Sequence, residues 1–270
     1  GMTRENEYYG NTQSVAAMKR SAAVWSLVRD DPRFTYYGRM VGVSQPVEDT
    51  ADLMAALARL QGAAPCYFYP KTQIPALYEA LERRGLSADR HEHFLGGEEA
   101  YAASRQALSD HSLPADLAVR KLDADTPGEF IADTVALMDS CEVMPVPAAM
   151  LRGRKCNGAC LVATDEAGQP VATASSYFMH PPGGPHAKTV FWGMLATRPD
   201  RRGEKIALLL GAQMIVHMWE EKGARAFMTG VRRDNASSTA LCNRLGVHDT
   251  AYAYATCVDV ETLGRKSITK

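Results

Sequence analysis

The chain has 270 residues, enough for one large domain or two small ones with packed cores. Its hydrophobic content of 46% and charged content of 23% are typical of a globular protein. Thirty basic and 31 acidic residues leave a net charge of −1, so no overall field favours nucleic acid or an anionic membrane as a partner. Since no signal peptide and no apolar run near 18 residues is recognisable, we expect a cytoplasmic protein.

The cysteines and histidines do not form a recognisable metal site. Six cysteines are scattered without a CxxC pair, and most lie beside apolar residues, which favours reduced, partly buried thiols. His91 and His93 alternate on a predicted strand and share one face of it, but the pattern favours a solvated or hydrogen-bonded pair over a metal site. We therefore predict that the protein binds no metal.

The first 115 residues are predicted to form an N-terminal α/β region. Helical spacing over residues 12–30 ends at an Asp-Asp-Pro sequence, and a strand is expected over residues 34–43. The elements that follow are a helix over 49–60, a strand over 65–69, a helix over 74–84 and a strand over 88–95.

This β-α-β-α-β order recurs over residues 188–258, and two interpretations stay open. The region is a degenerate copy of the later unit that has lost its ligand, or it is an unrelated α/β cap domain. Its helix start carries Glu48, Asp49 and Asp52, which would repel a phosphate group, so we expect no cofactor there.

Residues 96–114 are predicted to be a linker with a helical middle, which places a domain boundary between residues 115 and 116. A strand is expected over 117–122, helices over 126–140 and 145–152, and a hairpin of strands over 160–164 and 171–179. Gly168 suits the tight turn of that hairpin.

The most informative stretch runs from Lys188 to Asn235. An apolar strand over residues 188–199 leads into a long apolar helix over 200–223 and then a strand over 226–231. The turn between strand and helix contains Arg201, Arg202 and Lys205. Because the first amides of a helix lack internal partners and carry partial positive charge, this turn predicts an anion site.

Two motifs in and after this stretch resemble those of the GNAT superfamily of N-acetyltransferases. The family's pyrophosphate motif, Arg/Gln-x-x-Gly-x-Gly/Ala, aligns with residues 202–207, with Lys205 where the middle Gly is usual. A later motif aligns with Asn235, Ser238, Leu241, Cys242, Gly246 and Val247. The resemblance covers residues 117–260. It implies a mixed, largely antiparallel sheet of the acetyltransferase type with flanking helices, plus the smaller N-terminal α/β domain.

The resemblance also implies acetyl-coenzyme A as co-substrate. Its pyrophosphate would bind at the helix start, and its pantetheine arm would pair like an added strand with the backbone of Leu195 and Thr197. Asn235 would cap its helix and face the cofactor. The residues expected at the pyrophosphate are Arg202, Gly203, Glu204, Lys205, Ile206 and Ala207.

The general acid is less well defined. The family usually has a Tyr in the late helix, where this chain has Cys242, which is either a proton donor to the leaving thiolate or a small core residue. Tyr252 and Tyr254 on the next predicted strand are alternative acids. Glu142 is a poor candidate for a base, so the amine would lose its proton through water.

These features predict an acetyl-coenzyme A-dependent N-acetyltransferase. It would transfer the acetyl group directly, in a ternary complex, to an amine of a small molecule or peptide. The alternative is a non-catalytic acyl-coenzyme A binding or sensing protein; a purely structural protein would require the Arg-Gly turn to be a coincidence. No motif identifies the acceptor or the oligomeric state.

Overall fold

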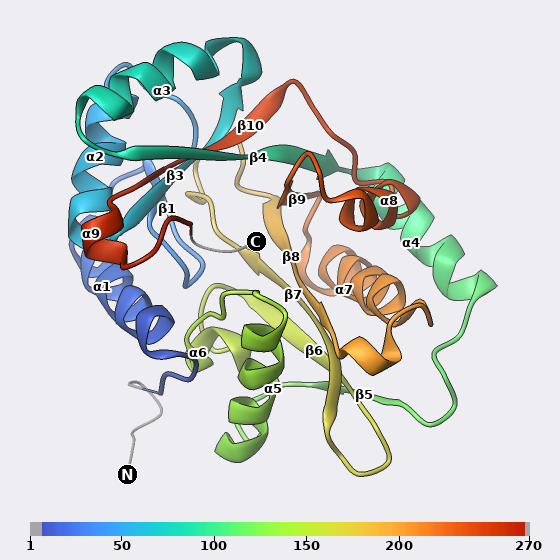
Figure 1. The fold of residues 1–270 in the computed structure, drawn as a ribbon. Helices are drawn as coiled ribbons and strands as arrows, with labels where there is room; N and C mark the ends of the chain where they lie inside the picture. The colour runs from blue at the N-terminus through green and yellow to red at the C-terminus, as the bar shows by residue number, and fades with distance from the viewer. Residues whose placement is uncertain (1–6, 268–270) are drawn as a thin grey trace.

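Figure 1 shows the computed structural model of the chain, which describes residues 7–267. Within these residues, ten strands form one sheet in the order β1-β2-β3-β10-β4-β9-β8-β7-β6-β5. The pairs β2–β3 and β8–β9 are parallel, and the other neighbours are antiparallel. The predicted mixed, largely antiparallel sheet with flanking helices is confirmed.

The N-terminal part supplies four strands and four helices to the described residues. In chain order they are α1 (Thr12–Val28), β1 (Phe34–Thr35), β2 (Gly42–Val43), α2 (Thr50–Gln61), β3 (Ala63–Pro70), α3 (Ile74–Arg83), β4 (Ser87–Gly96) and α4 (Glu98–Asp110).

The single strand predicted over residues 34–43 is wrong. Two short strands, β1 and β2, pair antiparallel, and the segment between them makes a turn at Gly38 with φ +115. A Cβ on Gly38 would lie 2.8 Å from Pro147 and 2.9 Å from Val146, so only glycine allows this close approach to those two residues. The turn therefore breaks the strand and holds Tyr37 and Arg39 against the C-terminal part.

The C-terminal part supplies the other six strands. Its elements are β5 (Ala118–Lys121), α5 (Gly128–Ser140), α6 (Ala148–Leu151), β6 (Gly158–Thr164), β7 (Pro170–Phe178), β8 (Thr189–Thr197), α7 (Ile206–Lys222), β9 (Ala226–Val231), α8 (Ala236–Arg244), β10 (Tyr252–Val258) and α9 (Val260–Leu263). The predicted β6–β7 hairpin is confirmed: the Asp165 amide donates to the Gln169 carbonyl at 3.0 Å, and Gly168 has φ +79.

The last strand of each part lies beside a strand of the other part. β10 is between β3 and β4, so Ala255 faces Cys66 on one side and Arg90 on the other. β4 in turn pairs with β9, where Leu95 is opposite Met228. Strands from both sides of the predicted 115/116 boundary thus alternate in the middle of the sheet (Figure 1), and the boundary itself stays a prediction.

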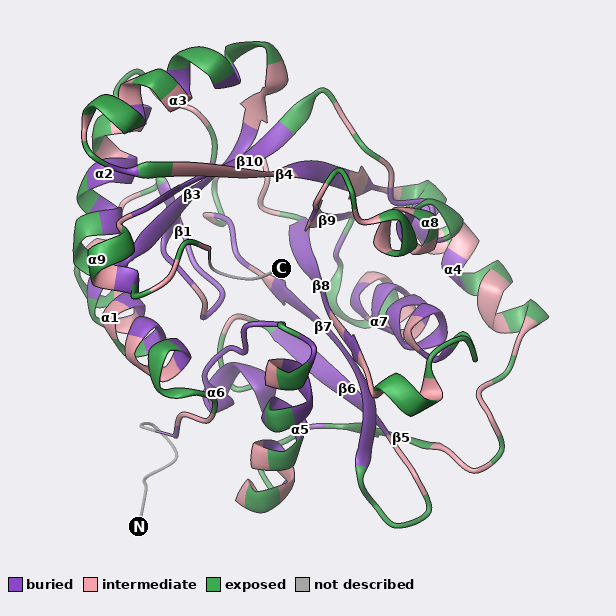
Figure 2. Cartoon of the chain, in the orientation of Figure 1, coloured by how far each residue is buried: buried purple, intermediate pink, exposed green. Residues whose placement is uncertain are grey.

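Helices cover both faces of the C-terminal half of the sheet. α4, α7 and α8 lie on one face and α5 and α6 on the other, and the strands between them are largely buried (Figures 1 and 2). Trp192 of β8 donates its indole N–H to the Gly211 carbonyl of α7 at 3.0 Å, and a Cβ on Gly211 would meet the Trp192 ring at 2.9 Å. Glycine therefore allows α7 to pack closely on the central strand.

None of the helices within residues 7–267 is long and apolar enough to span a membrane.

Candidate active site

The parallel strands β8 and β9 pair over only three residues and then separate. Residues 189–191 are in register with 226–228, and within the described residues no strand covers that edge of β8 from Gly193 to Thr197. A buried strand edge normally finds hydrogen-bond partners, because unpaired N–H and C=O groups are costly away from water. The bare edge is therefore suited to an extended ligand that pairs like an added strand.

A β-bulge in β8 lies where the strands separate. Between the pairs Thr173–Ala196 and Ser175–Gly193, Met194 and Leu195 oppose Ala174 alone. Met194 takes φ 54, and the Thr173 hydroxyl donates to its carbonyl at 2.8 Å. The bulge changes the direction in which the backbone groups of β8 point at this position.

Helix α7 begins at Ile206, so the predicted start at residue 200 is wrong. Pro199–Arg201 forms one turn of 3₁₀ helix, and Arg202 is extended. Gly203 (φ +87) and Lys205 (φ 63) are left-handed. These conformations are incompatible with an α-helix. The left-handed Lys205 also explains why glycine is usual at this position of the motif.

The start of α7 presents free amides. The first helical hydrogen bond runs from the Leu209 amide to the Lys205 carbonyl at 3.0 Å, and no side chain caps the helix. The amides of Ile206, Ala207 and Leu208 precede that bond and carry the positive end of the helix dipole. This end of the helix can accept a phosphate.

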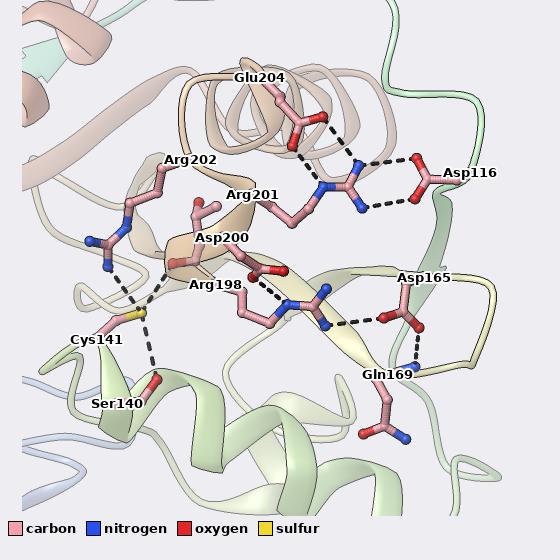
Figure 3. A network of polar contacts seen from close by, with 11 residues as sticks. Asp116, Ser140, Cys141, Asp165, Gln169, Arg198, Asp200, Arg201, Arg202 and Glu204 are labelled. Atoms are coloured by element: carbon pink, nitrogen blue, oxygen red, sulfur yellow. Dashed lines mark hydrogen bonds and ion pairs between the residues drawn. The ribbon is translucent and has the colours of Figure 1, made fainter.

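The cations of the turn differ in their availability (Figure 3). Arg201 is bound by both Asp116 and Glu204, at 2.8 Å and 2.7 Å, so it is not the free positive charge that the sequence suggested. Arg202 points instead toward the Sγ atom of Cys141, with Nη2 at 4.0 Å. Neither Arg202 nor Lys205 forms an ion pair with a described residue, and both are exposed. Two cations are therefore free to meet a ligand.

The bare edge of β8 and the start of α7 open on one cavity of about 760 Å³. Its size suits an elongated small molecule. The cavity brings together most of the residues predicted for the cofactor and for catalysis. Those that line it are Leu195, Thr197, Arg202, Gly203, Lys205, Ile206, Ala207, Asn235, Cys242 and Tyr254.

Two predicted site residues, Glu204 and Tyr252, do not line the cavity. The Glu204 carboxylate is held by Arg201, and Tyr252 is 39% exposed, with its ring against Phe68. Glu142, the weak candidate for a base, is also outside the lining. Asn235 caps α8 as predicted, with Oδ1 accepting the Ser238 amide at 3.1 Å.

The two acid candidates that remain, Cys242 and Tyr254, are both buried. Cys242 is 3% exposed and packs in the apolar core around α7, where burial raises the pKa of its thiol to about 12. The Tyr254 hydroxyl is also buried, and burial followed by the nearby Tyr67 raises its pKa well above the usual value. The Tyr254 Oη atom has no hydrogen-bond partner among the described residues. The hydroxyl is itself shielded from solvent, although Tyr254 lines the cavity.

His91 and His93 have different environments. His93 is fully buried between Phe68 and Tyr254, and its Nδ1 atom accepts the Phe68 amide at 3.2 Å. Burial lowers the pKa of His93 to about 3, so the ring is neutral. His91 lines the cavity. Among residues 7–267, no three His, Cys, Asp or Glu side chains are grouped to hold a metal ion.

The sequence analysis missed the cavity residues that come from the N-terminal part. Tyr37, Arg39 and Tyr67 line the cavity together with Asp89 and Phe191. Those from the N-terminal part, Tyr37, Arg39, Tyr67 and Asp89, lie in a region without a motif, so only their residue types could have indicated them. Their place at the site depends on contacts between distant segments of the chain.

Comparisons with known proteins agree with this geometry. Residues 133–247 match the model of the Acetyltransferase (GNAT) family. No curated protein matches the chain.

Solved structures resemble the chain in fold. A GCN5-related N-acetyltransferase from Kribbella flavida has a TM-score of 0.56 at 17% identity, covering 90% of this chain and 95% of that one. A tandem GNAT protein from the clavulanic acid biosynthesis pathway has 0.53 at 17%, covering 80% and 74%. A GCN5-related N-acetyltransferase-like protein from Streptococcus suis has 0.50 at 18%, covering 89% and 98%.

Proposed function

Because residues 133–247 match the model of the acetyltransferase (GNAT) family, we propose that the protein is an acetyl-coenzyme A-dependent N-acetyltransferase. It transfers the acetyl group directly, in a ternary complex, to a primary amine of a small molecule or peptide. The observation that carries this proposal is the separation of β8 from β9 directly in front of the start of α7.

The cavity suits each part of the cofactor. The pantetheine amides pair with the bare backbone of Leu195 and Thr197, and the pyrophosphate meets the free amides of Ile206 and Ala207. Gly203 leaves room beside the helix start, because a Cβ at this residue would have no heavy atom within 4 Å. The exposed cations Arg202 and Lys205 add charge for the phosphates.

The reaction requires one proton to leave and one to arrive. The neutral amine attacks the thioester carbonyl carbon, the new C–N bond forms, and the C–S bond breaks. The coenzyme A thiolate leaves and takes up a proton, while the amine nitrogen releases one to water. Holding both reactants in one cavity supplies most of the rate enhancement that such a transfer needs.

We propose Tyr254 as the residue that faces the leaving sulfur. Tyr254 lines the cavity, its buried hydroxyl has no hydrogen-bond partner among the described residues, and its ring packs over Gly230, where a Cβ would meet it at 2.7 Å. Gly230 follows Thr229, the β9 residue beside the bulge at Gly193. Cys242 also lines the cavity but is packed in the apolar core around α7, and we propose packing as its role.

The test combines binding with turnover. In a thermal-shift assay, acetyl-coenzyme A at ~100 times its dissociation constant should add about 2.7 kcal/mol to the free energy of unfolding. Thiol release should then rise above the buffer blank with at least one member of a broad panel of amines and peptides. No stabilisation at millimolar ligand would overturn the cofactor assignment.

One observation favours a second candidate, an acyl-coenzyme A sensor. Burial raises the pKa values of both Cys242 and Tyr254, and a high pKa makes each a weaker proton donor. A sensor would bind acetyl-coenzyme A in the thermal-shift assay yet release thiol no faster than the blank with every amine.

A further inference from the structure

Four aromatic rings form one wall of the cavity. Tyr37 stacks on Phe191 with ring centroids 4.4 Å apart, and Tyr67 meets Tyr254 edge to face at 4.8 Å. All four rings line the cavity. Two of them, Tyr37 and Tyr67, come from the N-terminal part. This wall suits an apolar or flat ligand body.

A single guanidinium, that of Arg39, lies on this wall. Its carbon Cζ is 5.4 Å from the Phe191 ring centroid and 5.9 Å from that of Tyr37. The Nε atom donates to the Met144 carbonyl at 2.9 Å, and Nη1 donates weakly to the Tyr37 hydroxyl at 3.4 Å. These contacts fix the direction of the guanidinium. They leave Nη2 without a partner among the described residues.

The cavity offers no free negative charge to balance Arg39. Among the described residues, Asp89 is the only carboxylate in the lining. Both of its oxygens are held by Arg232, at 2.7 Å and 2.8 Å. A polycationic acceptor would therefore find repulsion and no carboxylate to bind. An acceptor with its own anionic group would pair with the Arg39 guanidinium and neutralise its charge.

We propose that the acceptor is a small primary amine that carries an anionic group, bound by Arg39, with its body against the aromatic wall. The proposal rests on the proposed function, in which the cofactor arm pairs along β8 beyond Gly193 and the leaving sulfur faces Tyr254. The tip of the Phe191 ring would lie 3.1 Å from a Cβ on Gly193, and Arg39 lies over that same ring. The anionic group is thus bound close to the reacting nitrogen, as in an amino acid.

Calorimetry on matched ligands tests the proposal. Phenylalanine, leucine and alanine would be compared with the amines left by removing their carboxyl groups, and with the aminophosphonates that carry phosphonate in place of carboxylate. Each would be titrated into the protein with and without coenzyme A. We expect the anionic ligands of at least one size to bind at least ~tenfold more tightly than the matching amine. The ratio of carboxylate to phosphonate affinity identifies the anion.

Arg39→Gln should remove that preference. Arg33→Gln is the matched control, because Arg33 also lies over an aromatic ring, that of Phe34, but is paired with Asp31 and is absent from the cavity lining. If Arg39→Gln does not fold, Arg39→Lys keeps the charge and loses the planar fork, and should retain only part of the preference. The comparison of anionic ligands with their matching amines on the wild-type protein tests the proposal even if no variant folds.

Three results would overturn the proposal: equal or tighter binding of the amines without an anionic group, no binding of any ligand, or an unchanged preference in the Arg39 variant. These results are independent of the proposed function, which is measured by acetyl-coenzyme A binding and thiol release. Faster acetylation of phenethylamine than of phenylalanine would contradict the acceptor assignment while leaving the transferase assignment intact.

Discussion

The guanidinium of Arg232 holds both carboxylate oxygens of Asp89, with Nη1–Oδ1 at 2.7 Å and Nη2–Oδ2 at 2.8 Å. Asp89 is in β4 and Arg232 directly follows β9, so the pair joins the N-terminal part to the C-terminal part at the wall of the cavity. It neutralises the one carboxylate that lines the cavity in the described residues.

Asp89→Asn should lower stability at neutral pH by about 1–3 kcal/mol, the range for losing a charged hydrogen-bond partner. Burial raises the pKa of Asp89, but the hydrogen bond and charge of Arg232 outweigh it and lower the pKa overall. A lowered folded pKa means that the stabilisation is present above the unfolded pKa, about 3.9, and is lost as pH falls through the folded value. Urea denaturation at pH 7, 5 and 3 should show that the difference in free energy of unfolding between wild type and variant becomes smaller toward the lowest pH. Glu166→Gln, in the exposed β6–β7 turn, controls for the loss of one acidic charge; an unchanged difference would contradict the assignment.

Arg202→Glu should abolish stabilisation by acetyl-coenzyme A, because it places a negative charge beside the phosphates at the start of α7. The measurement is the ligand-induced shift in melting temperature. Lys222→Glu makes the same charge change at the far end of the same helix and should leave the shift nearly intact. Equal shifts in the wild type and in Arg202→Glu would place the phosphates elsewhere.

Lys205→Gly tests two effects of Lys205: the strain of its left-handed backbone and the contribution of its positive charge to cofactor binding. Lys205 is left-handed with φ 63, a conformation that costs a non-glycine residue about 1 kcal/mol or more, so glycine should raise the melting temperature. The loss of the ammonium group should weaken coenzyme A binding roughly threefold to tenfold, or about 0.7–1.4 kcal/mol. Lys205→Ala, which keeps the strain and loses the charge, should show the weaker binding without the stabilisation. Unchanged affinity in both variants would show that Lys205 does not contact the cofactor.

Tyr254→Phe should lower turnover by roughly 10² to 10⁴, the range for losing a general acid, with little change in cofactor affinity. The variant should be at least as stable as the wild type, because it removes a buried hydroxyl that has no partner in the described residues.

Cys242→Ala should instead cost about 1 kcal/mol of stability and leave turnover nearly unchanged. Tyr252→Phe, outside the cavity lining, is the control. Wild-type turnover in Tyr254→Phe would exclude the phenol as the acid.

Residues 1–115 and 116–270, expressed separately, should not fold, because β4 fills the space between β9 and β10. The C-terminal piece would lose the partners of β9 on one edge and of β10 on both. Exposed edges of this kind favour aggregation. Circular dichroism with thermal melting would show cooperative unfolding only when the two pieces are produced together. A cooperative transition in 116–270 alone would show that the C-terminal part folds independently.

The two segments with the same order of elements also share a parallel strand pair in the structure. β2-α2-β3-α3-β4 and β8-α7-β9-α8-β10 follow the same order, and each contains a parallel strand pair, β2–β3 and β8–β9. The N-terminal helix start still carries Glu48, Asp49 and Asp52, so we expect no cofactor there, and both interpretations of the region, a degenerate copy or an unrelated cap domain, stay open.

The amino-acid sequence by itself determined the features that depend on neighbours along the chain. The strand–turn–helix over residues 188–223, the Gly168 hairpin and the Asn235 cap follow from periodicity and turn chemistry within a few residues. The motif over residues 202–207 locates the helix start in the same way. The sequence does not give the first residue of α7, Ile206, because Lys205 before it is left-handed and that conformation depends on how the turn packs.

Only the tertiary structure decided which distant groups meet. Arg201 loses its free charge to Asp116, 85 residues earlier in the chain, and the order β10-β4-β9 places Asp89 beside Arg232. Arg39 reaches the cavity because the Gly38 turn fits against Pro147. Strand register, ion pairing and close packing are set by partners far away in sequence, and no local pattern records them.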